Sequence, residues 1–204
     1  MENININLVN PKHRKTVFEL LFKLRLHSEE SYVHSLDVAE KSLALAFALG
    51  INERDLEKLY TASLLHDIGK ICIDEDLLHK PNATNYEREL IRTGHIEGTK
   101  AILSEYFDAE IVRLAAHHHE RLNSSGYPEH LNATKLDILD RILQVADVTS
   151  ALAMNRSYQG AYEPSQAIEI LEHLVRRGEL DKKCVKEIER IFLIPLRNQS
   201  QLSS

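Results

Sequence analysis

The sequence of 204 residues has little of several residue types that define large classes of protein. Its two cysteines, Cys72 and Cys184, give neither a disulfide framework nor a zinc-ribbon motif, so we expect a reducing, cytoplasmic environment. Seven glycines and five prolines are few for an all-β sandwich or a disordered chain. The apolar runs are too short to cross a bilayer, and residues 1–10 lack the basic start and apolar stretch of a signal peptide.

Basic residues are also in the minority, with 25 Lys and Arg against 31 Asp and Glu, which gives a net charge of −6. This balance argues against binding to duplex nucleic acid, because Lys and Arg provide the affinity for its phosphates. The length and the ordinary composition predict one soluble globular domain. Histidine, by contrast, is abundant: the 11 histidines make the commonest metal ligand and general base of proteins a prominent feature here.

Apolar residues recur at helical spacing along most of the chain, and no segment alternates convincingly as a strand would. We therefore predict an all-α fold. Ser28 and Asn52 are expected to begin helices as N-caps, and Gly50 is expected to end one. The predicted helices cover residues 12–26, 28–49, 53–65, 85–93, a stretch after His95, 109–118, 136–154, 166–177 and 182–192.

The domain is expected to span residues 28–192. Residues 1–27 form an N-terminal segment whose helix either covers the core or makes a homodimer, and residues 193–204 form a polar tail. We recognise no regulatory domain within the sequence. The longest predicted loop, residues 120–134, is of a length that is often functional in a compact domain.

Two carboxylates fall on faces that the helical periodicity predicts to be buried. Asp67 follows His66, which continues the apolar face of the preceding helix, and Asp147 lies on a helix that is apolar almost all round. A buried carboxylate without a partner is costly. Asp147 would therefore pair with an arginine, cap a neighbouring helix or bind a metal, and its position alone leaves these alternatives open.

Histidines accompany these carboxylates on other predicted helices. His34 shares a helix face with Glu30, and adjacent helical residues diverge by about 100°, so the run 117–119 can direct only some of its imidazoles to one place. Imidazole and carboxylate ligands suit Fe, Mn, Zn or Ni rather than Ca. The seven candidate ligands named below exceed the needs of one tetrahedral ion, so we predict two or three divalent ions, with Asp67 as a bridge. These ligands are His34, His66, Asp67, His95, His118, His119 and Asp147.

Several motifs follow one another in a specific order. They are LLHDIGKICI (64–73), LLHKP (77–81), His95, HHERLNSSGYP (118–128), RILQVADVTSAL (141–152) and RSYQGA (156–161). In this order and spacing the chain resembles the HD-GYP domain family, a branch of the HD superfamily of metal-dependent phosphohydrolases that contains bacterial cyclic di-GMP phosphodiesterases. The resemblance covers about residues 28–192 and implies a compact multi-helix HD bundle.

The resemblance also implies roles for individual residues. It assigns the metals, with Fe or Mn favoured, to the seven ligands above, and Glu30 matches the position that carries a third metal in some members. Lys70 matches the lysine that contacts the scissile phosphate, and Arg156 the arginine that contacts a guanine or phosphate. The loop Gly126, Tyr127 and Pro128 lies beside the site in the family. His117 has no family role, and Tyr158 is expected to pack.

Three departures from the family pattern concern the surroundings of the site. The family usually reads DGxGYP, whereas this chain has Asn123-Ser124-Ser125 before Gly126-Tyr127-Pro128, so the aspartate and the first glycine are both replaced. The family's HPxxG is represented by residues 95–99, in which the glycine is displaced by one position. The second aspartate of the usual ADVxD is Ser150. If the replaced glycine adopts positive φ, Ser124 does so at a cost. These changes affect the shape of the loop and leave the predicted ligands in place.

The favoured function is hydrolysis of a cyclic dinucleotide, cyclic di-GMP first, to the linear dinucleotide and after a second cut to GMP. A metal-bridging hydroxide held by Asp67 would attack the phosphorus, and Lys70 would stabilise the developing charge. One alternative is a phosphohydrolase for another nucleotide or phosphate ester. Another is a non-catalytic metal- or nucleotide-binding module that engages a cyclic-dinucleotide signalling protein through residues 126–128. The ligand set favours catalysis, because buried ligands are costly to keep without their metals.

Overall fold

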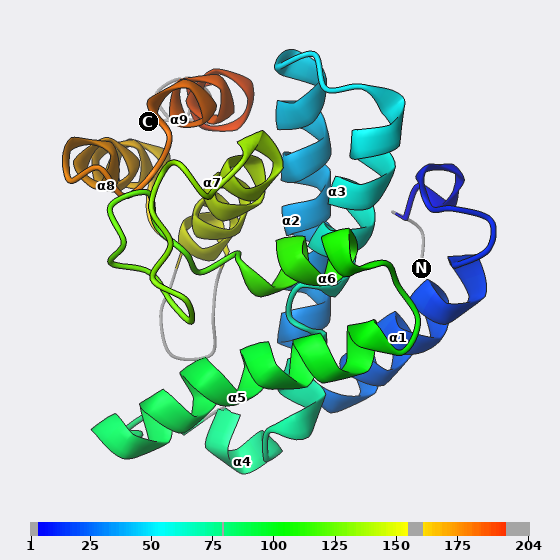
Figure 1. The fold of residues 1–204 in the computed structure, drawn as a ribbon. Coiled ribbons are helices and arrows are strands. Elements are labelled where there is room, and N and C mark those ends of the chain that lie inside the picture. The colour runs from blue at the N-terminus through cyan, green and yellow to red at the C-terminus, as the bar shows by residue number, and fades with distance from the viewer. Residues whose placement is uncertain (1–3, 79, 155–160, 195–204) are drawn as a thin grey trace, which may run out of the picture.

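The computed structural model describes residues 4–78, 80–154 and 161–194, and its regular elements are helical (Figure 1). Within these residues the only strand-like pairing is an isolated bridge between Asn123 and Asn132, so the predicted all-α fold is confirmed. The elements are η1 (Ile6–Leu8), α1 (Arg14–His27), α2 (Glu29–Ala48), α3 (Glu53–Leu65), η2 (Ile68–Cys72), α4 (Glu75–Leu78), α5 (Asn85–Ser104), α6 (Ala109–Ala116), α7 (Ile138–Ala153), α8 (Pro164–Arg176), α9 (Lys182–Ile188) and the π-turn η3 (Glu189–Leu193).

The helix starts read from the sequence are largely confirmed. The Ser28 hydroxyl accepts the N–H of Ser31 at the start of α2, and the Asn52 side chain accepts the N–H of Asp55 at the start of α3. These bonds satisfy backbone donors that have no partner within the helix. Gly50 follows α2 with a φ of +73°, a region that glycine enters without the penalty of a Cβ.

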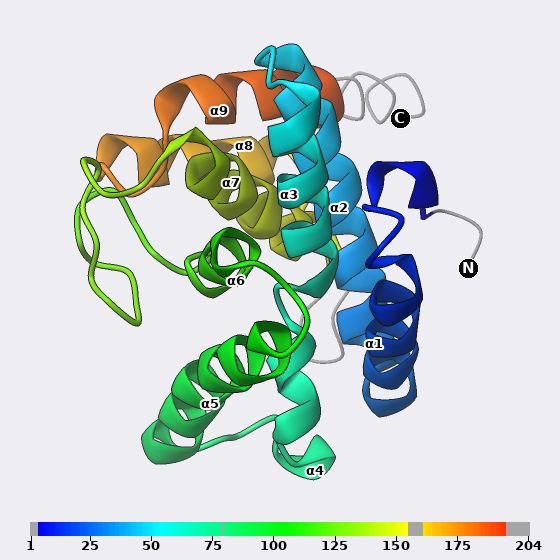
Figure 2. The same ribbon diagram turned by 45° about the vertical axis from the view of Figure 1, so that its right-hand side comes forward.

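The core forms where α2 packs against both α3 and α7 (Figure 2). Leu45 of α2, Leu59 of α3 and Leu143 of α7 are fully buried there. Their burial from water supplies the main driving force for holding the three helices together. Helices α2 and α7 carry His34 and Asp147, and the His66–Asp67 pair directly follows α3, so the core fixes the framework of the site.

The prediction of two separate helices around His95 is wrong, because α5 runs without a break through residues 85–104. Its N-terminus has a capping box, in which Thr84 and Glu87 each bond to the other's backbone N–H. Thr99 and Leu103 extend the buried face that His95 begins, so the apolar periodicity outweighs the low helix propensity of Gly94 within this segment.

Helix α5 lies directly on the short turn η2 that follows the His66–Asp67 pair. A Cβ on Gly69 would overlap the His95 carbonyl oxygen and the Thr99 backbone nitrogen. Only glycine therefore permits this approach, which brings His95 next to Asp67. The Thr99 hydroxyl strengthens the contact by accepting the N–H of Gly69 and donating to the His66 carbonyl.

Other helix ends differ from the predictions by a few residues. Helix α6 ends at Ala116 rather than at residue 118, because the backbone of His117 leaves the helical region. Helix α7 begins at Ile138, after an Asp137 cap, and α9 passes into the π-turn η3. The early end of α6 places His118 and His119 on a turn.

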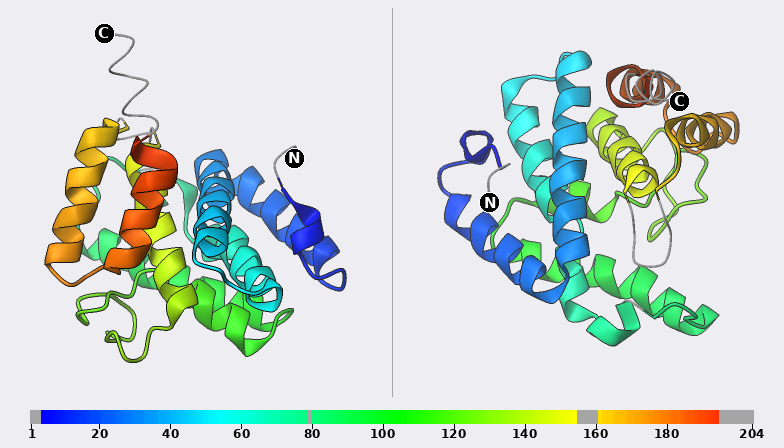
Figure 3. Two further views of the ribbon diagram at one scale, coloured as in Figure 1. Left: turned by 90° about the horizontal axis from the view of Figure 1, so that it is seen from above. Right: turned by 180° about the vertical axis from the view of Figure 1, so that it is seen from behind.

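Helices α8 and α9 lie side by side at one end of the bundle, and α1 lies at the opposite end (Figure 3). Helix α1 corresponds to the predicted N-terminal helix and packs against α2 and α3 through residues such as Leu21 and Leu24, which are buried. None of the described helices combines the length and the apolar character needed to cross a bilayer.

Candidate metal centre

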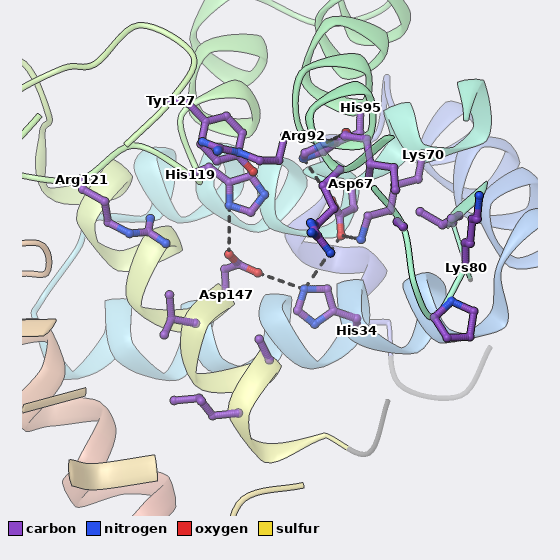
Figure 4. Close-up of a pocket in the computed structure, with 18 residues that line it drawn as sticks. His34, Asp67, Lys70, Lys80, Arg92, His95, His119, Arg121, Tyr127 and Asp147 are labelled. Carbon is purple, nitrogen blue, oxygen red and sulfur yellow. Dashed lines mark hydrogen bonds and ion pairs between the residues drawn. The ribbon is translucent and has the colours of Figure 1, made fainter. Parts of the chain in front are cut away.

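A cavity of about 610 Å³ opens between α2, α5, α7 and the loop after α6 (Figure 4). His34, Asp67, His95, His119 and Asp147 line it together. They come from five separate parts of the chain: α2, the turn after α3, α5, the turn after α6, and α7. The fold thus gathers most of the predicted ligands around one space, and His66 and His118 lie just beneath its wall.

The ligand atoms fall into two groups, and those of each group lie within 4.8 Å of one another. The first group contains His34, His66 and Asp67, and the second contains His95, His118 and His119. All of these residues except His119 are buried. Two neighbouring groups of three match the predicted need for more than one ion.

The carboxylate of Asp67 divides its two oxygens between the groups. Oδ2 lies 3.4 Å from Nε2 of His66 and 3.9 Å from Nε2 of His34. Oδ1 lies 3.9 Å from Nε2 of His95 and 3.8 Å from Nε2 of His118. A carboxylate can bind one ion through each oxygen, so this placement suits a bridge between two ions.

Asp147 spans the same space from α7. Its Oδ1 lies 3.0 Å from Nε2 of His34, and its Oδ2 lies 3.7 Å from Nδ1 of His119. The carboxylate oxygens of Asp147 thus contact imidazoles rather than an arginine or a helix N-terminus. Of the alternatives left open for this buried aspartate, the geometry favours metal binding.

Three histidines are oriented by backbone carbonyls. Nδ1 of His66 lies 2.8 Å from the Ser63 oxygen, and the corresponding distances for His95 and His118, to residues 91 and 115, are both 2.6 Å. A carbonyl oxygen can only accept, so each Nδ1 carries the proton and each Nε2 is the bare nitrogen. All three Nε2 atoms are buried without a hydrogen-bond partner. Buried polar atoms are costly when unsatisfied, and these three fit the requirements of a divalent metal ion.

The protonation states agree with this reading. Burial lowers the pKa of His118 to about 3 and also holds the pKa of His95 below its usual value. Burial opposes ionisation of Asp67, but Lys70 and His66 outweigh it and hold its pKa well below the usual range. His66 differs, because the neighbouring Asp67 carboxylate raises its pKa despite burial. Ionised carboxylates beside mostly neutral imidazoles are the states in which these groups bind metals.

Glu30 and His117 lie outside the two groups of ligands. Glu30 is half-buried one turn before His34 on α2, and it stays a predicted ligand for a third ion. His117 turns toward α7, where its Nδ1 lies 3.3 Å from Oδ1 of Asp140. This orientation accords with the lack of a metal-binding role for His117 in the family pattern.

Of the predicted substrate residues, Lys70 and Tyr127 line the cavity. Nζ of Lys70 lies 2.6 Å from Oδ2 of Asp67, and the Tyr127 ring lies 4.7 Å from the His119 ring. A Cβ on Gly126 would overlap the backbone of Glu120 and Arg121, so the loop packs tightly on the turn after α6. Pro128 follows Tyr127 and is half-buried. Arg156 and Tyr158 lie outside the described residues.

Sequence analysis missed two residues near the site. The buried carboxylate of Glu120 accepts the N–H groups of Glu129 and Leu131 at 2.6 and 2.8 Å, and so holds the GYP loop. Glu120 directly follows the histidine run in the sequence, and this position could have marked it as part of the site. Arg92 also lines the cavity, and its position three residues before His95 puts both on one face of α5.

Comparisons with known proteins agree with the geometry. A family model described as the HD domain matches residues 16–184. A 3'3'-cGAMP-specific phosphodiesterase of Vibrio cholerae is 35% identical over 175 residues, which cover 85% of this chain and 39% of that protein. A cyclic di-GMP phosphodiesterase of Pseudomonas aeruginosa is 33% identical over 150 residues, which cover 72% of this chain and 36% of that protein. The chain thus spans less than half the length of these curated relatives.

Solved structures show the same fold. The HD domain of the Listeria monocytogenes phosphodiesterase PgpH, in complex with cyclic di-AMP, has a TM-score of 0.66 at 17% identity and covers 89% of this chain and 96% of its own. An HDG"Y"P protein of Bdellovibrio bacteriovorus has a TM-score of 0.63 at 23% identity, and the match covers 78% of this chain and 51% of that one. At these identities the likeness concerns the fold alone.

Proposed function

The chain belongs to the HD domain family, and from this premise we propose that it is a metal-dependent phosphodiesterase that hydrolyses a cyclic dinucleotide. The observation that carries the proposal is the division of the Asp67 oxygens between two groups of histidines. Such a site suits the in-line displacement of a phosphodiester, in which the attacking and the leaving oxygen both need stabilisation. The relatives' names support this reaction class.

The residues of the chain have distinct tasks in this reaction. His34, His66, Asp67 and Asp147 would hold one ion, and His95, His118 and His119 a second, with Asp67 shared. Divalent ions bound there supply a water nucleophile that is active at neutral pH and neutralise charge on phosphoryl oxygens. Lys70, whose side chain is one-fifth exposed at the cavity, is placed to bind a nonbridging phosphate oxygen and stabilise the charge that builds on it.

Cyclic di-GMP is the first candidate substrate, and 3'3'-cGAMP is the second because relatives at 30–35% identity carry that name. The cavity lies within the usual size range for ligand sites, and cations such as Lys80, Arg88 and Arg121 line it beyond the metal centre. This excess of positive charge suits a ligand with two phosphates. The expected product is the linear dinucleotide, with GMP after a second cut.

The test is a product assay on protein loaded with Mn²⁺ or Fe²⁺. Cyclic di-GMP, 3'3'-cGAMP and cyclic di-AMP are incubated separately, and the products are separated by liquid chromatography. We expect hydrolysis of at least one guanine-containing ring, with cyclic di-AMP as the specificity control. Protein that retains its metals and hydrolyses none of the three would contradict the proposal. Binding of a cyclic dinucleotide without turnover would instead support the non-catalytic signalling module.

A further inference from the structure

The ring of Tyr127, in the GYP loop, has two flat neighbours. The His119 ring lies 4.7 Å away between centroids, at an interplanar angle of 33°. The central guanidinium carbon of Arg92 lies 4.1 Å from the centroid of the Tyr127 ring, within the range of a cation–π contact. Tyr127 therefore joins the second histidine group to an arginine on α5 (Figure 4).

Arg92 contacts Tyr127 and also lines the cavity. Its side chain is 49% exposed, and it lines the cavity in front of the metal centre. It forms an ion pair at 3.5 Å with Glu89, one turn earlier on α5, and this pair is weak because both side chains are exposed. A guanidinium is planar, so the face that does not lie on Tyr127 is available to a ligand in the cavity.

We propose that a nucleobase of the substrate stacks on this free face of Arg92, which makes Arg92 a substrate-contacting residue that extends the stack of His119 and Tyr127. The inference rests on the proposed function and specifies how that site holds its substrate. Guanidinium planes commonly stack on unpaired bases. Leu78, Pro81 and Ile91 also line the cavity and suit the apolar surface of a base.

A purely ionic contact with phosphate explains Arg92 less well. Lys70 already lies beside the metal centre and provides a positive charge there. Arg121 directs Nη1 to the carbonyl oxygens of residues 118 and 120, and Lys80 is paired with Glu87 at 2.7 Å. What Arg92 adds to these cations is a flat group already held over an aromatic ring, which is the feature that a base can use.

The experiment separates the flat shape of Arg92 from its charge. KM, kcat and the dissociation constant for cyclic di-GMP and 3'3'-cGAMP are measured for Arg92→Ala, Arg92→Lys and Arg92→Phe. Because stacking on one base accounts for roughly a tenfold or larger change in affinity, Arg92→Ala should raise KM by about that factor with kcat nearly unchanged. Arg92→Phe should recover most of the loss, and Arg92→Lys should not. Metal content should match the wild type in all three.

Arg176→Ala is the matched control, since Arg176 is an exposed arginine on α8 that pairs with Glu172 one turn earlier. It should leave KM unchanged. Rescue by Arg92→Lys but not by Arg92→Phe would assign Arg92 to a phosphate and overturn the stacking proposal. An unchanged KM in Arg92→Ala would also overturn it.

The failure of this inference can be told apart from failure of the proposed function. A wild type that binds cyclic dinucleotides without hydrolysing them contradicts the proposed function, and the dissociation constants of the variants still decide the role of Arg92. A wild type that neither binds nor hydrolyses any of them overturns both.

Discussion

The Ser150 hydroxyl oxygen lies 2.9 Å from Nδ1 of His34, so a side chain of α7 orients a predicted metal ligand of α2. His66, His95 and His118 are oriented by backbone carbonyls instead. Ser150 stands where the family usually has the second aspartate of its ADVxD motif. The neutral hydroxyl keeps the hydrogen bond to His34 without adding another buried charge to the site.

Replacing Ser150 by alanine should weaken metal binding. Loss of such an outer partner costs about 10- to 100-fold in metal affinity, because the ligand imidazole is no longer held in one orientation. The measurement is a competition titration with a metal chelator. Thr149→Ala is the control, since Thr149 is the adjacent buried residue and its hydroxyl donates to a carbonyl within α7. Equal affinities in Ser150→Ala and the wild type would refute a role in orienting His34.

Asp67→Asn should abolish most hydrolysis of cyclic di-GMP. Asparagine has nearly the same shape but offers one oxygen and no charge, so it cannot serve both histidine groups. We expect a loss of roughly a hundredfold or more in kcat when Mn²⁺ or Fe²⁺ is supplied. A melting curve recorded in parallel tests the structural alternative, in which Asn keeps part of the hydrogen bonding and stability alone declines. Full activity in this variant would end the two-metal mechanism.

Lys70→Ala should retain the metals and lose turnover. Its ammonium lies at the edge of the cavity, where it can stabilise charge on the phosphate, and removal of such a group costs about a hundredfold in kcat. Elemental analysis and steady-state kinetics are measured together. Lys58→Ala removes a lysine paired with Glu110 elsewhere on the surface and should behave as the wild type. Wild-type kcat in Lys70→Ala would show that the phosphate assignment is wrong.

Glu30→Ala tests for a third ion. Glu30 lies one turn before His34 on α2, the position that carries an additional metal ligand in some members of the family. The substitution should lower the metal content by about one ion per chain while the circular dichroism spectrum stays the same. Glu29→Ala is the control, because Glu29 is the adjacent residue and pairs with Arg25 on the surface. The same metal content in all three proteins would exclude Glu30 as the ligand of a further ion.

Ser124→Gly should stabilise the protein. Ser124 has a φ of +65°, in the left-handed region that glycine tolerates and other residues enter at a cost of roughly 1–2 kcal/mol. The greater freedom of glycine in the unfolded chain offsets part of the gain, which leaves about 0.5–1 kcal/mol in the free energy of unfolding. Denaturant titration measures it. Ser125→Gly should instead destabilise, because it removes the bond from the Ser125 hydroxyl to Asn123.

Much of the fold followed from local patterns. The bounds of α3 agree with the prediction, because its polar N-cap Asn52 and its buried face both leave a signal within the segment. The break predicted near His95 is wrong, because α5 continues through this region. What decides that region is the packing of η2 against α5 at Gly69, a contact between segments that no local pattern reveals.

The site divides in the same way. Histidines and aspartates on buried faces were recognisable, because burial of such groups requires a partner. The assignment of the Asp67 oxygens to two groups, and the cation–π contact of Arg92 with Tyr127, depend on distances between distant segments. Ser124 is an intermediate case: the family pattern indicated where a glycine is missing, and the structure gives the positive φ there.

The separation of the ligands along the chain has a consequence for folding. His34 and Asp147 are 113 positions apart in sequence, yet they meet at the same site. An ion bound by both closes a very long loop, much as a covalent cross-link would, and it favours the folded chain over the unfolded one by the free energy of its binding. Metals bound in this way would join α2 to α7, and the stability of the fold would then depend on the supply of metal.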